Sequence, residues 1–435
     1  MPAPTLAEVI FPEQANHNFS RILGDLKRSN LSITNRLGSI RHDASFVEDV
    51  AAALKLPLVA NERCGSWYID PARKAGSAYF KSTDGHTGQW KFSTRRLNLH
   101  LLELIGEHDG LVVFKMPDAL SKTIPIWCAV LNRILFPAAP HHHQLFVPPS
   151  AVSASEASQI AARLPEFEAA FRALALDAAP LRARLTKPLR PVWTTPDDDG
   201  DAPAAGPVAA VAAAGFHPVV CCTSSRRVAG AEVAARGYIQ GAGDDTENWA
   251  MGLTAGVFWR HAAELLGAAE GELPGLIAGF LEEEAQDAEA ALGAGDCCVV
   301  SLLPRVTEQS VWAKSARHLE VGLGKSKAAS RALRNSLPRI CEFVSRFLNE
   351  PGTGDGKRVV VLCESGRELS VGVALAVYCW CFGASGDVRP DGDRESFNKT
   401  AIRVKLGQIM TALPDANPSR ATLQSVNSYL MDWRK

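Results

Sequence analysis

Apolar residues near the start of the chain recur at the spacing of a helix with one buried face. Between residues 17 and 42 they lie three or four positions apart, and residues 43–56 indicate a further short helix. The opposite side of the first helix is basic, with Arg28, Arg36 and Arg41. We therefore expect two helices here, the first of which exposes a row of arginines.

The pattern changes in the middle of the chain. Short apolar runs at 111–114 and 219–222 predict buried strands, and the spacing over 155–176 predicts a helix. Residues 194–215 are rich in Pro, Ala, Gly and Asp, a composition typical of a disordered loop.

Strands and helices alternate in the last third of the chain, beyond an acidic, alanine-rich stretch at 283–296 that indicates a domain boundary. Strand–turn–helix units of this kind predict a small α/β domain with a parallel central sheet. The expected strands are 298–302 and 359–363, and the expected helices are 330–348, 369–382, 397–413 and 419–432. We expect an N-terminal domain over residues 1–285 and a C-terminal domain over 286–435.

Composition narrows the class of protein only slightly. The 435 residues are 46% hydrophobic and 21% charged, as in an ordinary globular protein, and a net charge of −1 requires any RNA-binding surface to come from local clustering. The ten cysteines form no CxxC pair, which is typical of buried thiols in a reducing compartment. The start of the chain does not resemble a signal peptide, and no apolar run reaches the ~18–20 residues of a membrane span. We expect a cytoplasmic protein.

The densest group of polar residues is KSTDGHTGQW, residues 81–90. Glycines let backbone N–H groups approach an anion, hydroxyl groups add donors, and lysine adds charge. The segment therefore predicts an anion site, with a simple turn as the alternative. The candidate residues are Lys81, Ser82, Thr83, Asp84, Gly85, His86 and Gln89, followed by Arg95 and Arg96.

Two further polar segments are candidates for ligand contacts. Hydroxyl and basic side chains at the end of a buried strand are placed to receive an anion, and here they are Thr223, Ser224 and Arg226. Asp244 and Asp245 lie in a loop with two glycines. Mg²⁺ favours one or two carboxylates together with phosphate oxygens, so these aspartates are candidate ligands; an acidic N-cap is the alternative.

The strand over 359–363 leads into a loop formed by Cys363, Glu364, Ser365, Gly366 and Arg367. This loop resembles that of dual-specificity-type phosphatases, whose amides hold phosphate while a thiolate attacks it. Those enzymes have an arginine six residues after the cysteine, where this chain has Leu369. Without that bidentate donor the transition state loses stabilisation. We expect a phosphate-binding or scaffold loop, with a purely structural turn as the alternative.

A basic stretch precedes this loop in the sequence. Gly324-Lys325-Ser326 suggests a nucleotide-binding loop, but that pattern requires glycine at the position of Leu319. The remaining cations between 317 and 339 indicate either a solvated face or a surface that contacts an RNA backbone.

Five segments together point to one family. They are NRLGSIRHD (35–43), NERCGSWY (61–68), KSTDGHTGQW (81–90), CCTSSRR (221–227) and the altered phosphatase loop. In these segments the chain resembles the initiator-tRNA 2′-O-ribosylphosphate transferases of fungi and plants, and the similarity covers nearly its whole length. The resemblance implies an α/β fold: a family-specific mixed α/β N-terminal domain followed by a dual-specificity-phosphatase-like α/β C-terminal domain.

The activity that the resemblance implies is transfer of ribosyl phosphate from 5-phosphoribosyl 1-diphosphate (PRPP) to tRNA. The acceptor is the 2′-hydroxyl of the T-stem adenosine at position 64 of initiator methionine tRNA, and the modification blocks use of this tRNA in elongation. Cleavage of the C1–pyrophosphate bond leaves negative charge on the leaving group, which Mg²⁺ and basic side chains must neutralise.

The roles that follow are hypotheses. The catalytic residues would be Lys81 and either Asp84 or His86, one of which deprotonates or orients the 2′-hydroxyl. Substrate would be held by Arg36, Arg63, Ser82, Thr83, Gly85, Gln89, Arg95, Arg96, Thr223, Ser224 and Arg226. The metal would be held by Asp244 and Asp245.

The expected partner is tRNA, bound by a monomer through the basic helix 17–41 and the segment 317–339. Two alternatives remain at this point. One is a phosphatase that works through Cys363, and the other is a non-catalytic tRNA-binding protein with a relic phosphatase domain.

Overall fold

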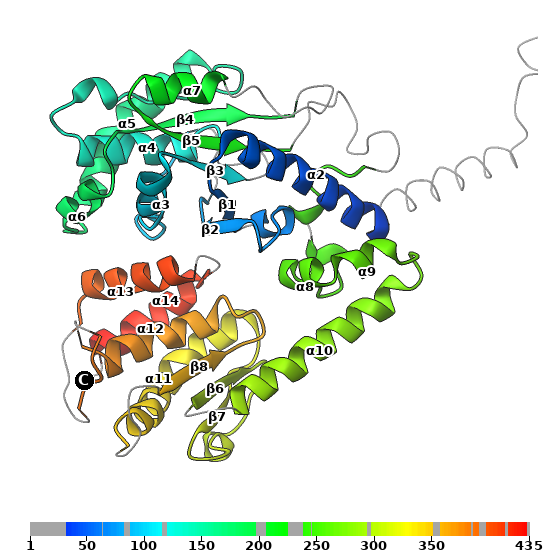
Figure 1. Ribbon diagram of the computed structural model, residues 1–435. Coiled ribbons are helices and arrows are strands. Elements are labelled where there is room, and N and C mark those ends of the chain that lie inside the picture. The colour runs from blue at the N-terminus through cyan, green and yellow to red at the C-terminus, as the bar shows by residue number, and fades with distance from the viewer. Residues whose placement is uncertain are drawn as a thin grey trace, which may run out of the picture.

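Two parallel β-sheets organise the chain in the computed structural model (Figure 1). The structure describes residues 32–62, 64–81, 88–114, 120–196, 206–224, 238–244, 246–293, 297–350, 357–383, 386–390, 397–413 and 416–432. No helix in these ranges is both long enough and apolar enough to cross a membrane.

The first sheet has five strands in the order β2-β1-β3-β5-β4, and all neighbouring strands are parallel. The strands are β1 (Leu58–Asn61), β2 (Lys74–Ala78), β3 (Leu111–Phe114), β4 (Leu189–Thr194) and β5 (His217–Cys222). The carboxyl ends of all five therefore lie at one edge. The connection from β1 leads to one side and the connection from β2 returns to the other, so β1 and β3 flank a topological switch point, where parallel α/β sheets bind ligands.

Helices cover both faces of this sheet because successive strand residues point in opposite directions. Val113 packs in the core formed with α3 (Leu101–His108), α4 (Thr123–Leu135) and α5 (Ala154–Arg172). Val112 and Phe114 pack in the core on the other side, with α2 (Ile33–Leu54), α8 (Ala255–Arg260) and α9 (Ala262–Gly267). The remaining elements of this part are α6 (Ala178–Ala183), α7 (Gly206–Ala213), η2 (Gly65–Tyr68), η3 (Pro140–His142), η4 (Ala242–Asp244) and η5 (Thr246–Asn248).

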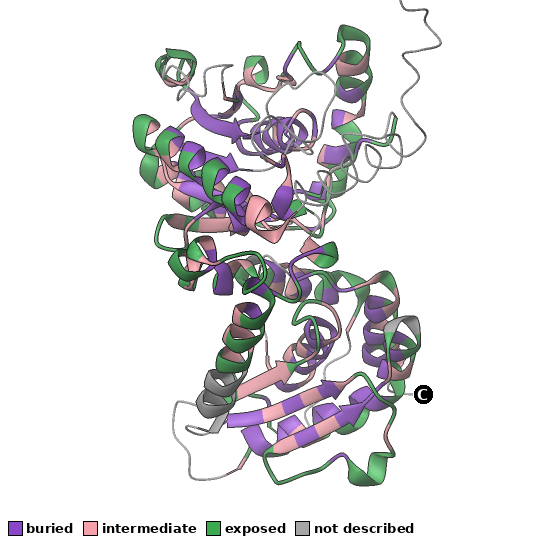
Figure 2. Ribbon diagram, turned by 90° about the vertical axis from the view of Figure 1, so that its right-hand side faces the viewer, coloured by how far each residue is buried: buried purple, intermediate pink, exposed green. Residues whose placement is uncertain are grey.

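The second sheet has three parallel strands in the order β7-β6-β8. They are β6 (Cys297–Leu303), β7 (His318–Gly322) and β8 (Arg358–Leu362), accompanied by η6 (Gln309–Val311). The helices of this part are α11 (Ser326–Leu348), α12 (Leu369–Cys381), α13 (Lys399–Ala412) and α14 (Arg420–Asp432), and α10 (Leu273–Gly293) leads into it. Figure 2 shows the difference between the sheets: strands of the first are buried, whereas those of the second are partly exposed.

The structure confirms the predicted strands and helices of the C-terminal part, and the mixed α/β class of the fold. It differs from the sequence-based expectation in three places. Residues 33–54 form one continuous helix, which ends at Lys55 with φ 53°, instead of two. The prediction of a loop over 194–215 is wrong at Gly206–Ala213, which form α7, while 197–205 lie outside the described residues. The acidic stretch after residue 283 is helical as far as Gly293.

Candidate active site

The carboxyl edge of the five-stranded sheet brings several predicted site residues to one side of the molecule. Lys81 follows β2 and is exposed, whereas Thr223 and Ser224 follow β5 and are buried. The Thr223 N–H donates to the carbonyl of Thr194 at the end of β4 (3.1 Å). Eight other predicted site residues lie outside the described residues: Arg63, Ser82, Thr83, Asp84, Gly85, His86, Arg226 and Asp245.

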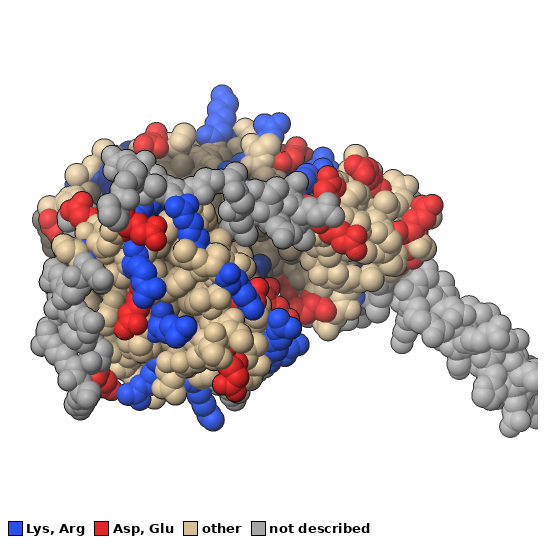
Figure 3. Space-filling model, turned by 90° about the horizontal axis from the view of Figure 1, so that it is seen from below, with Lys and Arg blue, Asp and Glu red and all other residues tan. Residues whose placement is uncertain are grey.

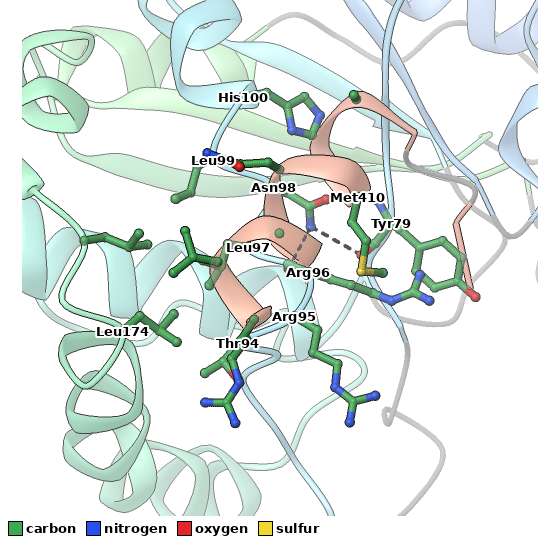
Figure 4. Close-up of a pocket in the computed structure, with 16 residues that line it drawn as sticks. Tyr79, Thr94, Arg95, Arg96, Leu97, Asn98, Leu99, His100, Leu174 and Met410 are labelled. Atoms are coloured by element: carbon green, nitrogen blue, oxygen red, sulfur yellow. Dashed lines mark hydrogen bonds between the residues drawn. The ribbon is translucent and has the colours of Figure 1, made fainter. Parts of the chain in front are cut away.

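Two asparagines fix the backbone immediately before Lys81. The Phe80 N–H donates to Oδ1 of Asn61 (2.7 Å), whose Nδ2 donates to the Phe80 carbonyl (3.3 Å). Asn98 holds Tyr79 in the same way, through bonds of 3.0 and 3.3 Å, and its Nδ2 also lies 3.3 Å from the carbonyl of Arg96 (Figure 4). Both asparagines are buried, so the start of the segment 81–88 has a fixed position.

The other end of this segment is attached to α5. Nε1 of Trp90 donates to Glu156 (3.0 Å), which also pairs with Lys122 (2.8 Å). Nη1 of Arg163 donates to the carbonyls of Gly88 (3.4 Å) and Trp90 (3.3 Å). The hydrogen bond from Lys122 lowers the pKa of Glu156, although burial opposes it, so this carboxylate stays charged. The segment that contains Asp84 and His86 is thus held at both ends. Gln89 is exposed.

A buried carboxylate that sequence reasoning did not single out lies at the end of β1. Glu62 accepts hydrogen bonds from the hydroxyls of Ser66 and Ser77 and pairs with Lys74 (3.3 Å). These contacts tie the end of β1 to β2. The only signal in the sequence was its place in NERCGSWY, because its partners become neighbours only when the strands pair.

The segment with the candidate metal ligands is anchored on α2 and η2. The Tyr238 hydroxyl donates to Asp43 (2.8 Å), and the Gly243 N–H donates to the Tyr68 hydroxyl (2.8 Å). Burial raises the pKa of Tyr68, and the nearby Cys64 and Asp244 add to the rise. Asp244 itself is exposed.

Arg36 lies on the same side of the molecule. Its guanidinium is 5.6 Å from the ring of Trp249, whose Nε1 donates to the carbonyl of Ala242 in η4 (2.9 Å). The structure therefore brings Arg36 close to the segment that carries Asp244. No group of three or more acidic, histidine or cysteine side chains in the described ranges could hold a metal ion.

Arg95 and Arg96 lie elsewhere, in a groove between the two parts of the chain (Figure 4). Two adjoining cavities of about 390 and 600 Å³ form it, lined on one side by residues of 79–100 and on the other by α13 and the start of α14. Arg96 is engaged in the contact between the two sides. Its guanidinium stacks on Tyr79 at 3.3 Å, and its Nη2 donates to Oδ1 of Asn417 (2.8 Å) and to the carbonyl of Ala416 (3.4 Å).

The C-terminal loop has the local geometry of the phosphatase loop that it resembles. Sγ of Cys363 lies 3.2 Å from Oγ of Ser370 and 3.8 Å from Oγ of Ser365. Burial raises the pKa of this thiol, but the hydrogen bonds from the two serines outweigh burial and lower it below its ordinary value. Gly366 has φ 64°, a conformation that favours glycine. Leu369 is the first residue of α12, so the position of the missing arginine is occupied by an apolar side chain.

Glu364 and Arg367 are exposed, and the contacts of this loop lead to the groove. The carbonyl of Arg367 accepts the N–H of Asn417 (2.7 Å), the residue whose side chain binds Arg96. Beneath the loop, Glu368 accepts the Thr422 hydroxyl (3.2 Å). The altered phosphatase loop and the polar segment of the first domain are therefore connected through one residue.

Comparison with known proteins places these features in a family. The family model described as Rit1 N-terminal domain matches residues 26–282, more than half of the chain, and the one described as Rit1 DUSP-like domain matches residues 317–430. The chain is 30% identical to the tRNA A64-2′-O-ribosylphosphate transferase of Saccharomyces cerevisiae, over 97% of this chain and 96% of the yeast protein. It is 33% identical to an uncharacterized protein of Schizosaccharomyces pombe, over 91% of this chain and 94% of that protein. No solved structure matches.

Proposed function

This chain belongs to the Rit1 family, and we propose that it is a glycosyltransferase that transfers ribosyl phosphate from PRPP to the 2′-hydroxyl of A64 in initiator methionine tRNA. The observation that carries the proposal is similarity to the yeast tRNA A64-2′-O-ribosylphosphate transferase along almost the entire length of both chains. The carboxyl edge of the five-stranded sheet supports it, because cationic and hydroxyl side chains follow strand ends there.

In the proposed reaction, the 2′-oxygen of A64 attacks C1 of PRPP while the bond from C1 to pyrophosphate breaks. Thr223 and Ser224 would hold the 5-phosphate at the end of β5. Lys81 and Arg95 would neutralise the leaving pyrophosphate, together with Arg63. The proton of the 2′-hydroxyl would pass to Asp84 or His86, in the segment whose ends are fixed by Asn61, Asn98, Glu156 and Arg163.

A magnesium ion fits this reaction as an ion held mainly by the substrate. Asp244 offers an exposed carboxylate on a loop anchored to Tyr68, and Mg²⁺ commonly takes one or two carboxylates and completes its shell with phosphate oxygens and water. Asp244, with Asp245 beside it in the sequence, would supply the protein ligands. The bound ion would offset charge on the pyrophosphate. We propose that the enzyme acts on tRNA as a monomer.

The direct test is incubation of the full chain with initiator methionine tRNA, Mg²⁺ and PRPP, followed by nuclease digestion and mass spectrometry. The T-stem fragment that contains A64 should gain the mass of one ribosyl phosphate, and elongator methionine tRNA should gain none. Binding of tRNA with no gain in mass would support a non-catalytic tRNA-binding protein instead. Gain of mass on elongator tRNA would overturn the proposed specificity.

Variants of the polar segment test the assignment of roles. Asp84→Asn should abolish transfer, whereas Asp49→Asn, which alters an exposed carboxylate on α2, should leave the rate unchanged. If His86 is the base, His86→Gln should also remove the acidic limb of the pH–rate profile. Near-normal turnover by Asp84→Asn would rule out a role for this carboxylate in proton transfer.

A further inference from the structure

The groove between the two domains runs across residues that lie far apart in the sequence. Its two cavities share Tyr79, Thr94, Arg95, Arg96 and Met410, so they form one continuous depression. One end begins at Lys81, the residue from which the segment with Asp84 and His86 departs. Anything that lies in the groove therefore lies next to the proposed site of chemistry.

The charge of this groove has one sign. Lys81, Lys91 and Arg95 line it from the N-terminal domain, and Arg403 and Arg420 line it from the C-terminal domain. No aspartate or glutamate is among the described residues of its lining. All five cations are exposed, and none forms an ion pair with a carboxylate in the described part of the chain. A cleft lined by one sign of charge concentrates ligands of the opposite sign.

Elsewhere the charges are more mixed. Viewed from below, basic side chains are interspersed with acidic ones on the C-terminal domain, and acidic side chains gather on the side of α9 and α10 (Figure 3). On α11, for example, Arg334 pairs with Asp432 at 3.4 Å. The groove is therefore better suited to a polyanion than the α11 face, which the sequence suggested as an RNA surface.

We propose that the groove binds the phosphate backbone of the acceptor tRNA, and that Arg403 and Arg420 of the C-terminal domain bind phosphates there. This inference rests on the proposed function. Arg96 is excluded from this role because its guanidinium already bridges Tyr79 and Asn417 and so holds the two walls together. The N-terminal wall offers Lys81, Lys91 and Arg95 to the same strand of RNA.

A phosphate backbone fits the position better than the small donor PRPP does. The donor is expected at the strand ends near Thr223 and Ser224, whereas the groove opens along the outer side of β2, through Tyr79 and Phe80. A duplex stem is bound mainly through its phosphates and 2′-hydroxyls. A stem whose backbone follows the groove past Lys81 would present a ribose to the segment that contains Asp84 and His86.

The test is tRNA binding by the double variant Arg403→Ala/Arg420→Ala of the full chain, measured by fluorescence anisotropy between 50 and 200 mM salt. Each lost phosphate contact reduces the slope of log K against log salt by about 0.7–0.9. Two lost contacts should therefore make the affinity about 7–12-fold less sensitive to this fourfold change in salt. Binding of PRPP alone, measured by calorimetry, should be unchanged, which also shows that the variant is folded.

Two further variants make the result specific. Lys314→Ala/Arg346→Ala removes the same charge from exposed sites of the C-terminal domain outside the groove, and its salt slope should match that of the unaltered protein. Arg331→Ala/Arg339→Ala tests the α11 face. A slope that changes in this variant and not in Arg403→Ala/Arg420→Ala would overturn the proposal, as would loss of PRPP binding by Arg403→Ala/Arg420→Ala, which would place the donor in the groove.

Failure of this inference can be distinguished from failure of the proposed function. If the unaltered protein modifies tRNA but Arg403→Ala/Arg420→Ala binds tRNA with an unchanged slope, the groove is not the RNA site and the transferase assignment stands. If the unaltered protein binds tRNA through these arginines and never transfers ribosyl phosphate, the groove proposal stands and the transferase assignment fails.

Discussion

Replacing Asn61 by alanine removes the side chain that holds the backbone just before the proposed catalytic segment. Asn61 is fully buried and makes both a 2.7 Å and a 3.3 Å hydrogen bond to the backbone of Phe80, which is 4% exposed. In Asn61→Ala the N–H and carbonyl of Phe80 lose these partners, and there is little access for water to replace them. The expected consequence is a loss of stability together with a loss of alignment at Lys81.

The size of the stability loss follows from the two backbone groups. A buried donor or acceptor left without a partner costs about 1–3 kcal/mol, so two such groups cost about 2–6 kcal/mol. Domains of ordinary stability unfold with about 5–15 kcal/mol, so Asn61→Ala should remain folded at low temperature. The free energy of unfolding of the N-terminal domain, measured with urea, should fall by this amount.

Asn132 provides a matched control for the effect on activity. Its side chain makes the same pair of bonds to the backbone of Leu189, both at 2.8 Å, but at the amino end of β4, away from the proposed site. Asn132→Ala should lose similar stability and keep its rate of ribosyl phosphate transfer per folded molecule. Asn61→Ala should lose at least tenfold of that rate, which corresponds to about 1.4 kcal/mol of lost transition-state stabilisation. Equal transfer rates in the two variants would refute a positioning role for Asn61.

Three further predictions concern other parts of the molecule. The protein should not release phosphate from an aryl phosphate, and Cys363→Ser should leave tRNA modification unchanged while removing the thiol that iodoacetamide alkylates fastest at neutral pH, because the pKa of this thiol is lowered. Gly372→Ala should destabilise the C-terminal domain by about 1–3 kcal/mol in urea titrations, since its Cβ would lie 2.4 Å from a methyl group of α14, whereas Gly38→Ala, with no atom within 4 Å, should stabilise α2 by about 0.5–1 kcal/mol; the reverse order would contradict the helix packing described above. Burial lowers the pKa of His217 although Asp109 lies 2.7 Å away, so the unfolded chain takes up its proton first; stability should be complete above the unfolded pKa of about 6.5 and decline as pH falls below it, and the urea midpoint of His217→Gln should decline less between pH 7.5 and 5.5.

Local sequence patterns were sufficient for most of the C-terminal domain. Its strands are short apolar runs and its helices have a clear apolar period, so neighbouring residues determine each element. The same reasoning failed at Gly206–Ala213, where composition suggested a loop and the structure has α7. Pro, Gly and Asp on its N-terminal side dominated the interpretation, although alanine has the highest helix propensity of all residues.

The candidate site was predictable only in part. The polar density of residues 81–90 drew attention to the segment itself, but nothing local indicated how its ends are held. Asn61 lies 19 residues from its partner Phe80, and Trp90 lies 66 residues from its partner Glu156. Polar residues so far apart in the sequence are matched only by the pairing of strands and the docking of helices, which periodicity does not report.

The groove could not be predicted at all, because its two walls are separated by more than 300 residues. The bond from Arg96 to Asn417 spans 321 positions. In the sequence, Arg96 was a phosphate ligand by its proximity to residues 81–90, and Arg403 and Arg420 were two cations among many. Only the packing of α13 and α14 against residues 79–100 gives these arginines a common surface and gives Arg96 a different partner.

Asn417 connects the two loops in which the sequence suggested phosphate chemistry. Its side chain accepts from Arg96, and its N–H donates to the carbonyl of Arg367 in the altered phosphatase loop. A working phosphatase needs an arginine directed at the phosphoryl oxygens, and here Leu369 takes that place at the start of α12. The loop has therefore lost the residue that stabilises a phosphoryl transition state, while its backbone takes part in the contact that holds the walls of the groove together. This arrangement favours a supporting role for the C-terminal loop and leaves the segment between Lys81 and Gly88 as the place where a reaction on tRNA would occur.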